Sequence, residues 1–258
     1  RADIPRADRL VELLRAVVPG LCSVCLSVNS RRTNVILGTD IRVLWGKAAM
    51  EDTLCGLHFA VSPLSFFQVN PKQTEKLYGL ALDYAGLTGN ETVVDAYCGA
   101  GTISLLLAQK AKKVIGIEIV PEAIQNANEN AARNNIANAE FRVGATEELL
   151  PQLVADGLRP DVIVLDPPRK GCDPAVLQAI ISAAPKRVVY VSCGAPTLAR
   201  DAKLLAEGGY AAEKVQCVDM FCWTGAVETV MCFSKETYPH RSVKVEFLLE
   251  GLNVAQLQ

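Results

Sequence analysis

The sequence ETVVDAYCGAGTISLLLAQ, residues Glu91–Gln109, decides the fold of this chain. Apolar residues lead to Asp95, a short glycine-bearing loop follows, and an apolar helical run begins at Thr102. This order predicts a strand, a tight turn and a helix. Gly99 and Gly101 allow the turn to approach a ligand closely and to adopt conformations that a side chain disfavours. The helix that follows would direct its unpaired N–H groups toward a ligand in the crevice.

An acidic residue, Glu118, ends the next apolar run, nineteen residues after Gly99. A carboxylate at that position can accept hydrogen bonds from both hydroxyls of a ribose. The dinucleotide fingerprint G-x-G-x-x-G is incomplete, because Ser104 stands where its third glycine would be. The pattern therefore favours a nucleoside-like cofactor without a pyrophosphate. S-adenosylmethionine fits, with its ribose at Glu118 and its amino-acid end near Asp95; an ordinary strand–helix turn without a ligand is the alternative.

Composition limits the class of protein. The chain has 258 residues, half of them hydrophobic, and no apolar run of about 18 residues, so we expect a globular protein that does not span a membrane. A net charge of −2 does not favour strong nonspecific binding to nucleic acid, so RNA contacts must be local or come from another segment. The chain begins at Arg1 without a signal-peptide pattern, and we expect a trimmed, cytoplasmic, monomeric protein.

The nine cysteines indicate reduced thiols in an intracellular protein. Cys22 and Cys25 form a C-x-x-C pair, but the surrounding LCSVCLSVN predicts a strand, which would place positions three apart on opposite faces. No second pair follows, and His58 and His240 are distant in the sequence. We therefore expect no metal in this segment.

The first 70 residues predict a small α+β domain. Apolar spacing indicates a helix over residues 5–18, and short β-branched runs from Leu21 to about Val61 indicate a small mixed sheet. Three cations lie at its expected turns: Arg31, Arg32 and Lys47. Asn70 and the proline after it then predict the start of a helix that ends near Gly86.

Residues 71–235 alternate between strands and helices, which predicts a Rossmann-like fold with a mostly parallel seven-stranded sheet. The expected strands are Thr92–Asp95, Lys113–Glu118, Glu140–Val143, Asp161–Leu165, Arg187–Ser192, Glu213–Asp219 and Ala226–Phe233. The expected helices begin near Thr102, Pro121, Thr146 and Asp173. In the tail, residues 236–258, the run VKVEFLLE alternates as an additional strand would. Ligands of such folds bind at the carboxyl ends of the strands.

Three side chains at strand ends are candidates for chemistry. Asp166 precedes two prolines in VIVLDPPRKG, which hold the backbone rigid beside the crevice, where it could hold a planar base. Cys193 ends another strand, and we expect the helix that begins near Pro196 to lower its thiol pKa. Glu228 lies among apolar residues in VETVM, where a carboxylate is unfavourable unless it is used or paired, for example with Arg200.

Together these motifs resemble those of the RNA uracil-5-methyltransferase family, which makes 5-methyluridine in ribosomal and transfer RNA. In order they are FFQVNPKQTEKLY, DAYCGAGTISL, GIEIVPEAIQNANENA, DPPRKG, VSC-x-x-x-TLARD and VETV, and they extend from about Leu57 to Phe233. The residues before Leu57 resemble the central domain of that family. Its N-terminal β-barrel domain and cysteine-ligated iron–sulfur segment have no counterpart in this sequence, and Cys22 and Cys25 do not match that segment.

The resemblance implies methylation of carbon-5 of a uridine in RNA by S-adenosylmethionine, with 23S ribosomal RNA favoured over tRNA. Cys193 would be the nucleophile that adds to carbon-6 of a flipped uracil, and Glu228 the base that removes the carbon-5 proton. The implied cofactor-binding residues are Gln68, Tyr97, Gly99, Thr102, Glu118 and Asp166. The residues implied near the target uracil are Phe66, Asp166 and Arg169.

Three places depart from the family pattern. Gly194-Ala195-Pro196 follows Cys193 where the family usually has Asn-Pro, Trp223 and Ala226 stand where it usually has histidines, and Ala145 replaces an acidic or amide residue. Two alternatives therefore stay open. One is a cytosine-5 enzyme, although those place a Pro-Cys pair where this chain has Pro167-Pro168-Arg169. The other is a noncatalytic RNA-binding fragment.

Overall fold

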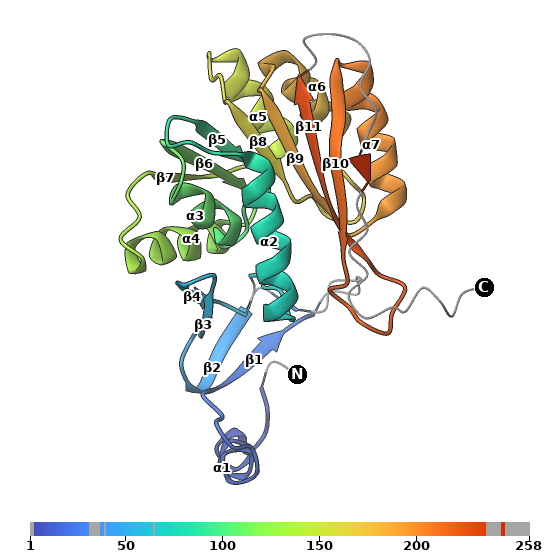
Figure 1. The fold of residues 1–258 in the computed structure, drawn as a ribbon. Coiled ribbons are helices and arrows are strands. Elements are labelled where there is room, and N and C mark those ends of the chain that lie inside the picture. The colour runs from blue at the N-terminus through green and yellow to red at the C-terminus, as the bar shows by residue number, and fades with distance from the viewer. Residues whose placement is uncertain (1–2, 31–36, 39, 64, 236–243, 246–258) are drawn as a thin grey trace, which may run out of the picture.

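The computed structural model describes residues 3–30, 37–38, 40–63, 65–235 and 244–245 (Figure 1). Arg31, Arg32 and most of the tail lie outside the described residues. The helices are α1 (Ala7–Val17), α2 (Pro71–Ala85), α3 (Thr102–Ala108), α4 (Pro121–Arg133), α5 (Thr146–Ala155), α6 (Pro174–Ala183) and α7 (Ala195–Glu207). The strands are β1 (Ser23–Val28), β2 (Asp40–Gly46), β3 (Met50–Leu54), β4 (Leu57–Val61), β5 (Thr92–Asp95), β6 (Lys113–Glu118), β7 (Ala139–Val143), β8 (Val162–Leu165), β9 (Arg187–Ser192), β10 (Tyr210–Val218), β11 (Glu228–Lys235) and β12 (Lys244–Val245).

The main sheet has the strand order β12-β10-β11-β9-β8-β5-β6-β7. Strands β5 to β9 are parallel, whereas β11 runs antiparallel to both β9 and β10. These seven strands confirm the predicted mostly parallel sheet. The two-residue β12 extends it by pairing with β10, within the run VKVEFLLE.

Helices cover both faces of this sheet, so its central strands carry apolar side chains on both faces. Helices α2, α3 and α4 pack on one face and α5, α6 and α7 on the other (Figure 1). Val93 joins the first core with Leu77, and its neighbour Val94 joins the second with Leu150. Burying one such side chain stabilises the fold by about 1.5–3 kcal/mol. No helix in the described part of the chain has the length and hydrophobicity of a membrane span.

The prediction of one mixed sheet before Val61 is wrong. The structure contains two separate antiparallel pairs, β1 with β2 and β3 with β4. Cys55 and Gly56 join β3 to β4, both with positive φ (49° and 79°), which is the backbone of a tight two-residue hairpin. The outer edge of β4 contacts side chains of α4, so no further strand pairs with it there.

Helix α2 begins and ends as predicted. The Asn70 side chain accepts a hydrogen bond from the Gln73 N–H (3.3 Å), Pro71 occupies the first turn, and Gly86 ends the helix with φ 57°. The same Asn70 side chain donates to the carbonyl of Met220 (3.2 Å), so the start of α2 is tied to the segment that precedes β11.

Strand β5 is the point where the order of strands reverses, because β6 and β7 follow on one side and β8 and β9 on the other. A crevice forms at the carboxyl ends of the strands at such a switch point. The turn into it needs glycine: Gly99 and Gly101 have φ of 52° and 83°. A Cβ on Gly101 would also lie 3.0 Å from Cβ of Ala127.

Candidate active site

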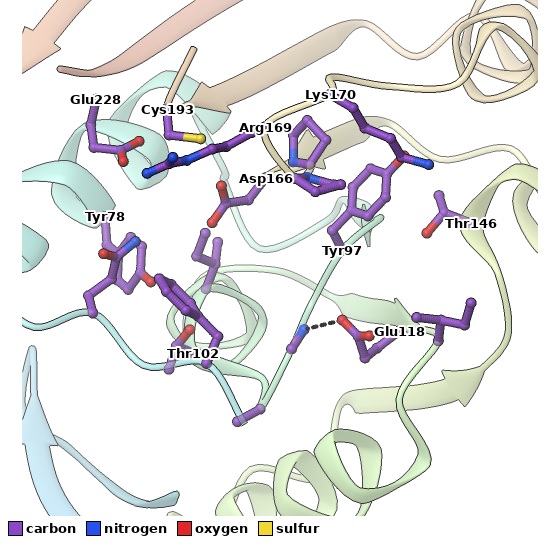
Figure 2. Close-up of a pocket in the computed structure, with 18 of the residues that line it drawn as sticks. Tyr78, Tyr97, Thr102, Glu118, Thr146, Asp166, Arg169, Lys170, Cys193 and Glu228 are labelled. Carbon is purple, nitrogen blue, oxygen red and sulfur yellow. Dashed lines mark hydrogen bonds between the residues drawn. The ribbon is translucent and has the colours of Figure 1, made fainter. Parts of the chain in front are cut away.

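A cavity of about 620 Å³ opens at the carboxyl ends of the parallel strands (Figure 2). Its volume lies in the usual range for small-molecule sites. All ten residues that the sequence predicted as site residues line this cavity. They are Phe66, Gln68, Tyr97, Gly99, Thr102, Glu118, Asp166, Arg169, Cys193 and Glu228.

At one end of the cavity, the backbone orients the carboxylate of Glu118. Its two oxygens accept hydrogen bonds from the N–H groups of Gly99 (3.2 Å; dashed in Figure 2) and Val120 (2.9 Å). Each oxygen keeps a lone pair for a further donor. A Cβ on Gly99 would meet no atom within 4 Å, so this glycine leaves open space beside the carboxylate. The exposed side chain of Ile119 lines the wall next to it.

Behind the lining, Ser104 holds the buried carboxyl group of Asp95. Its hydroxyl donates to Oδ2 of Asp95 at 2.6 Å, which gives a role to the serine that replaces the third glycine. Burial raises the pKa of Asp95 to about 6. Asp95 does not line the cavity itself, so the amino-acid end of a ligand would meet the lining residues first. Among the lining residues, Gln68 has a buried Oε1 without a hydrogen-bond partner in the described structure. This oxygen is available to accept a hydrogen bond from a ligand.

At the other end, the topology brings Cys193 and Glu228 together. Cys193 follows β9, and Glu228 begins β11, whose next residue, Thr229, pairs with Ser192 of β9. Because β11 is antiparallel to β9, its first residue lies at the carboxyl end of β9. Figure 2 shows Arg169 reaching past Cys193 toward the Glu228 carboxylate, with Asp166 beside it. These four side chains form the acidic end of the cavity.

Burial and neighbouring charges raise the pKa of the titratable groups at the acidic end of the cavity. The pKa of the Cys193 thiol is raised by burial and by the carboxylates of Glu228 and Asp166, while Arg169 lowers it. The expectation of a lowered thiol pKa at Cys193 is therefore wrong. Desolvation and two neighbouring carboxylates outweigh the partial positive charge of α7, which is small and screened.

The two carboxyl groups there hold protons more tightly than usual. Burial, Glu228 and Asp95 raise the pKa of Asp166 to about 8. Burial raises the pKa of Glu228, and Arg169 opposes this shift. The expected pairing of Glu228 with Arg200 is not present, because Arg200 is paired with the buried Asp201 at 2.8 Å.

Several cavity residues were missed by the sequence reasoning. Tyr78, Thr146, Lys170 and Phe221 also line the cavity. Tyr78 lies on the buried face of α2, one turn after Thr74, so its pattern is that of an ordinary core residue. Its hydroxyl nevertheless lies beside Thr102 and Gln68, and burial and Asp166 raise its pKa.

The positions that depart from the family pattern do not line the cavity, but they lie close in sequence to Cys193, Phe221 and Thr146, which do. Gly194 caps α7 with an extended backbone, and its N–H donates a hydrogen bond to the Ser192 hydroxyl oxygen (3.1 Å). Trp223 is fully exposed in the connection between β10 and β11, with φ 69°. Ala145 begins α5 without a side-chain cap.

Cys22 and Cys25, the C-x-x-C pair, are exposed free thiols at β1. Cys25 lies on the strand, and its sulfur is 3.3 Å from the Ser23 hydroxyl. Within the described ranges, no group of three or more His, Cys, Asp or Glu side chains could hold a metal ion.

Comparison with known proteins identifies the family. Residues 87–234, more than half of the chain, match the family described as methyltransferase domain, so the chain belongs to this family. An uncharacterized RNA methyltransferase of Halalkalibacterium halodurans is 53% identical over 228 residues, which are 88% of this chain and 50% of the relative. One of Clostridium acetobutylicum is 51% identical over 233 residues, 90% of this chain and 51% of the relative. The chain thus spans about half the length of the curated relatives it matches.

Solved structures agree on the fold. The tRNA (uracil-54, C5)-methyltransferase of Pyrococcus abyssi, in complex with S-adenosyl-L-homocysteine, is 32% identical with a TM-score of 0.70, over 82% of this chain and 50% of that one. The tRNA m1G37 methyltransferase of M. jannaschii is 16% identical with a TM-score of 0.56, over 77% and 61%, and shows the fold alone. The fold is that of the S-adenosylmethionine-dependent methyltransferases.

Proposed function

We propose that this chain is the catalytic part of an RNA methyltransferase that transfers a methyl group from S-adenosylmethionine to carbon-5 of a uridine. One observation carries the proposal. A single cavity holds a thiol beside two carboxyl groups and an arginine at one end, and an oriented carboxylate beside a glycine turn at the other. This combination suits a nucleoside-like methyl donor next to a pyrimidine base.

The residues present fit the methyl donor. Glu118, oriented by two backbone N–H groups, would accept hydrogen bonds from ribose hydroxyls, and Gln68, Tyr97, Gly99 and Thr102 would line the rest of its site. The carboxyl groups of Glu118, Asp166 and Glu228 in the lining, with Asp95 behind it, suit the positive sulfonium and ammonium groups of this cofactor. When bound, the cofactor supplies an electrophilic methyl group.

The side chains at the acidic end would make carbon-5 reactive. Uracil carbon-5 is too weak a nucleophile by itself, so the Cys193 thiol would lose its proton to solvent and the resulting thiolate would add to carbon-6. The electron pair of the ring double bond moves into an enolate, and carbon-5 could then take the methyl group as the bond between methyl carbon and sulfonium sulfur breaks, which would leave S-adenosylhomocysteine. Glu228 removes the proton from carbon-5, the double bond re-forms, and the bond between carbon-6 and sulfur breaks. The thiolate is thereby restored.

Arg169 and Asp166 would serve the base during these steps. Arg169 is exposed and reaches over the acidic end, where its charge favours the thiolate of Cys193. The pKa of Asp166 is raised to about 8, so its carboxyl group can hydrogen-bond the uracil ring either as a donor to a ring oxygen when protonated or as an acceptor from the ring N–H when the bound cofactor ionises it. Phe66, which is 70% exposed at the cavity, offers an aromatic face for a flipped base.

The cytosine-5 alternative needs a nucleophile close after the aspartate of β8. Cys172, the cysteine nearest to Asp166 in sequence, is 3% exposed, and burial raises its pKa to about 12. It does not line the cavity, whereas Cys193 does. The arrangement therefore favours uracil over cytosine as the base.

Trapping the covalent adduct tests the proposal. With S-adenosylmethionine and RNA containing 5-fluorouridine, we expect a denaturation-resistant protein–RNA adduct, because fluorine blocks removal of the carbon-5 substituent. Cys193→Ala should abolish it, and Cys217→Ala, at an exposed free thiol on β10, should retain it. An adduct that still forms with Cys193→Ala, or the absence of an adduct with the unaltered chain, would contradict the mechanism.

The proposed substrate is 23S ribosomal RNA. The Pyrococcus abyssi structure described above is that of a tRNA (uracil-54, C5)-methyltransferase, so transcripts of both RNAs should be compared under the same conditions. Product nucleosides should contain 5-methyluridine. Methylation of the tRNA alone would exclude ribosomal RNA, and 5-methylcytidine would favour the alternative.

A further inference from the structure

Helix α4 carries three asparagines at a spacing of four residues: Asn126, Asn130 and Asn134. Residues four apart lie on one face of a helix, one above the other. They belong to the run QNANENAARNN, for which the proposed reaction has no use. Asn130 is fully buried and Asn126 nearly so. Buried amides of this kind destabilise a protein unless their hydrogen-bonding groups are satisfied.

The amides of two of these asparagines replace a neighbouring strand along the edge of β4. Asn134 accepts from the N–H of His58 (2.8 Å) and donates to its carbonyl (2.7 Å). Asn130 does the same with Ala60 (2.7 and 3.1 Å). Four residues of helix rise about 6 Å and two residues of strand about 6.8 Å, so the two repeats nearly match. These four hydrogen bonds form a ladder between α4 and β4, and the ladder fixes the hairpin of β3 and β4 to the methyltransferase domain.

Asn130 also contacts the glycine turn, Gly99–Gly101, at the end of the cavity where Glu118 lies. We call this the cofactor end. The second N–H of its amide donates to the carbonyl of Ala100 at 3.2 Å, and Ala100 lies between Gly99 and Gly101. One buried side chain thus joins the turn that lines the proposed cofactor site to strand β4.

Asn126 continues the ladder into the segment that carries two cavity residues. Its Oδ1 accepts from the N–H of Ser62 (3.1 Å) and from the hydroxyl of Ser65 (2.9 Å). Phe66 and Gln68, which follow at once, line the cavity. The glycine turn and this segment are therefore held by neighbouring positions on the same face of α4.

We propose that Asn126 and Asn130 are positioning residues that couple the cofactor end of the cavity to the Phe66–Gln68 segment. Binding at the glycine turn would reduce opening of the turn, and through Asn130, α4 and Asn126 it would order the segment that meets the base. The identity of the ligand rests on the proposed function.

Hydrogen exchange with and without S-adenosylhomocysteine tests this coupling. In the unaltered chain we expect protection of the glycine turn and also of residues 58–68. In Asn126→Ala, protection of the turn should persist and protection of residues 65–68 should be lost. Asn126→Asp should behave as the unaltered chain, because the bonds that Asn126 makes to the described residues Ser62 and Ser65 both use its oxygen, and a carboxylate keeps both acceptor bonds.

The variants should also differ in whether they change kcat or the affinity for S-adenosylhomocysteine. Asn126→Ala should lower kcat about tenfold while the dissociation constant of S-adenosylhomocysteine changes less than about twofold, because the lost contacts are on the base side. Asn130→Asp, which removes the donors to Ala60 and Ala100, should weaken that ligand about tenfold. Asn134→Ala is the matched control, since it contacts β4 but neither cavity segment, and it should leave both values near those of the unaltered chain.

Two outcomes would overturn the inference. Protection confined to the glycine turn in the unaltered chain would show that the two segments are independent. Equal behaviour of Asn126→Ala and Asn126→Asp would show that the acceptor bonds carry no coupling. Absence of protection anywhere would instead remove the cofactor site, and with it the proposed function.

Discussion

At the scale of single residues, the reactivity of Cys193 depends on a balance of opposing charges. Burial, Glu228 and Asp166 raise the pKa of the thiol, and Arg169 is the neighbour that lowers it. Near neutral pH the thiol therefore holds its proton, and the reactive thiolate is the minor form. The adduct-forming rate should rise with pH, as the thiolate fraction grows.

Arg169→Gln should move this rise to higher pH. Removing the guanidinium takes away a charge that favours the thiolate, and because this exposed charge is screened, the rate of adduct formation at saturating RNA near neutral pH should fall about two- to threefold. The rate should be measured against pH with 5-fluorouridine RNA. Lys170→Gln is the matched control, because it also removes one positive charge from the cavity lining, whereas Arg169 is the cation that lowers the Cys193 pKa. A uniform loss at every pH would show that Arg169 only binds the base.

Some residue-level predictions depended on surroundings that a local pattern does not contain. Cys193, Glu228 and Asp166 were identifiable because each ends or begins an apolar strand. The direction of the Cys193 pKa shift was predicted wrongly, because burial and the carboxyl groups of Glu228 and Asp166, which come from other parts of the fold, raise it. Tyr78 was missed because a buried tyrosine on a helix has the same pattern whether it contacts the core or a cavity.

At the scale of secondary structure, the elements with strong local signals were predictable. Asn70 and Pro71 mark the start of α2, and Asp173 caps α6 through the Ala175 N–H (2.9 Å). The separation of the β1–β2 and β3–β4 pairs was not predictable, because it depends on side chains of α4 that occupy the edge of β4. Those contacts join residues about 70 positions apart, beyond the reach of any local pattern.

Asn70→Ala should destabilise the protein by about 1–2 kcal/mol. The substitution removes the N-cap, worth about 1 kcal/mol, and the hydrogen bond to the Met220 carbonyl, worth about as much. The melting temperature should fall by about 3–8 °C in a thermal scan followed by circular dichroism. Asn70→Asp keeps the cap acceptor but loses the donor to Met220, so its melting temperature should lie between the two. Equal values for Asn70→Asp and Asn70→Ala would mean that the cap contributes nothing.

At the scale of the whole molecule, the cavity follows from topology rather than from any one motif. Strand β5 reverses the strand order, and the antiparallel β11 returns Glu228 to the end where β9 delivers Cys193. Alternation of strands and helices was enough to predict that these ends meet. The balance of charge inside the cavity required the structure, since it sums groups from five strands and their connections.

This balance should make the cavity prefer a cationic ligand increasingly as pH rises. The pKa of Asp95 is about 6 and that of Asp166 about 8, both above the ordinary value of 3.8, so both groups gain negative charge between about pH 5 and pH 9. S-adenosylmethionine carries one more positive charge than S-adenosylhomocysteine. The ratio of their affinities should therefore shift toward S-adenosylmethionine by about tenfold over this range, a size that Coulomb attraction at an effective dielectric constant of about 20 can supply.

Isothermal titration of both ligands across this pH range measures the ratio. Asp166→Asn should flatten its rise, because it removes the group with the higher pKa. Glu118→Gln is the control, since its proposed ribose contact is common to both ligands: it should weaken both alike and leave the ratio unchanged. Near neutral pH, S-adenosylmethionine should also release more protons than S-adenosylhomocysteine on binding, because its charge drives the two carboxyl groups toward ionisation. A ratio that stays constant with pH would mean that neither carboxyl group senses the sulfonium, and the cavity would then select its ligand by shape and hydrogen bonding alone.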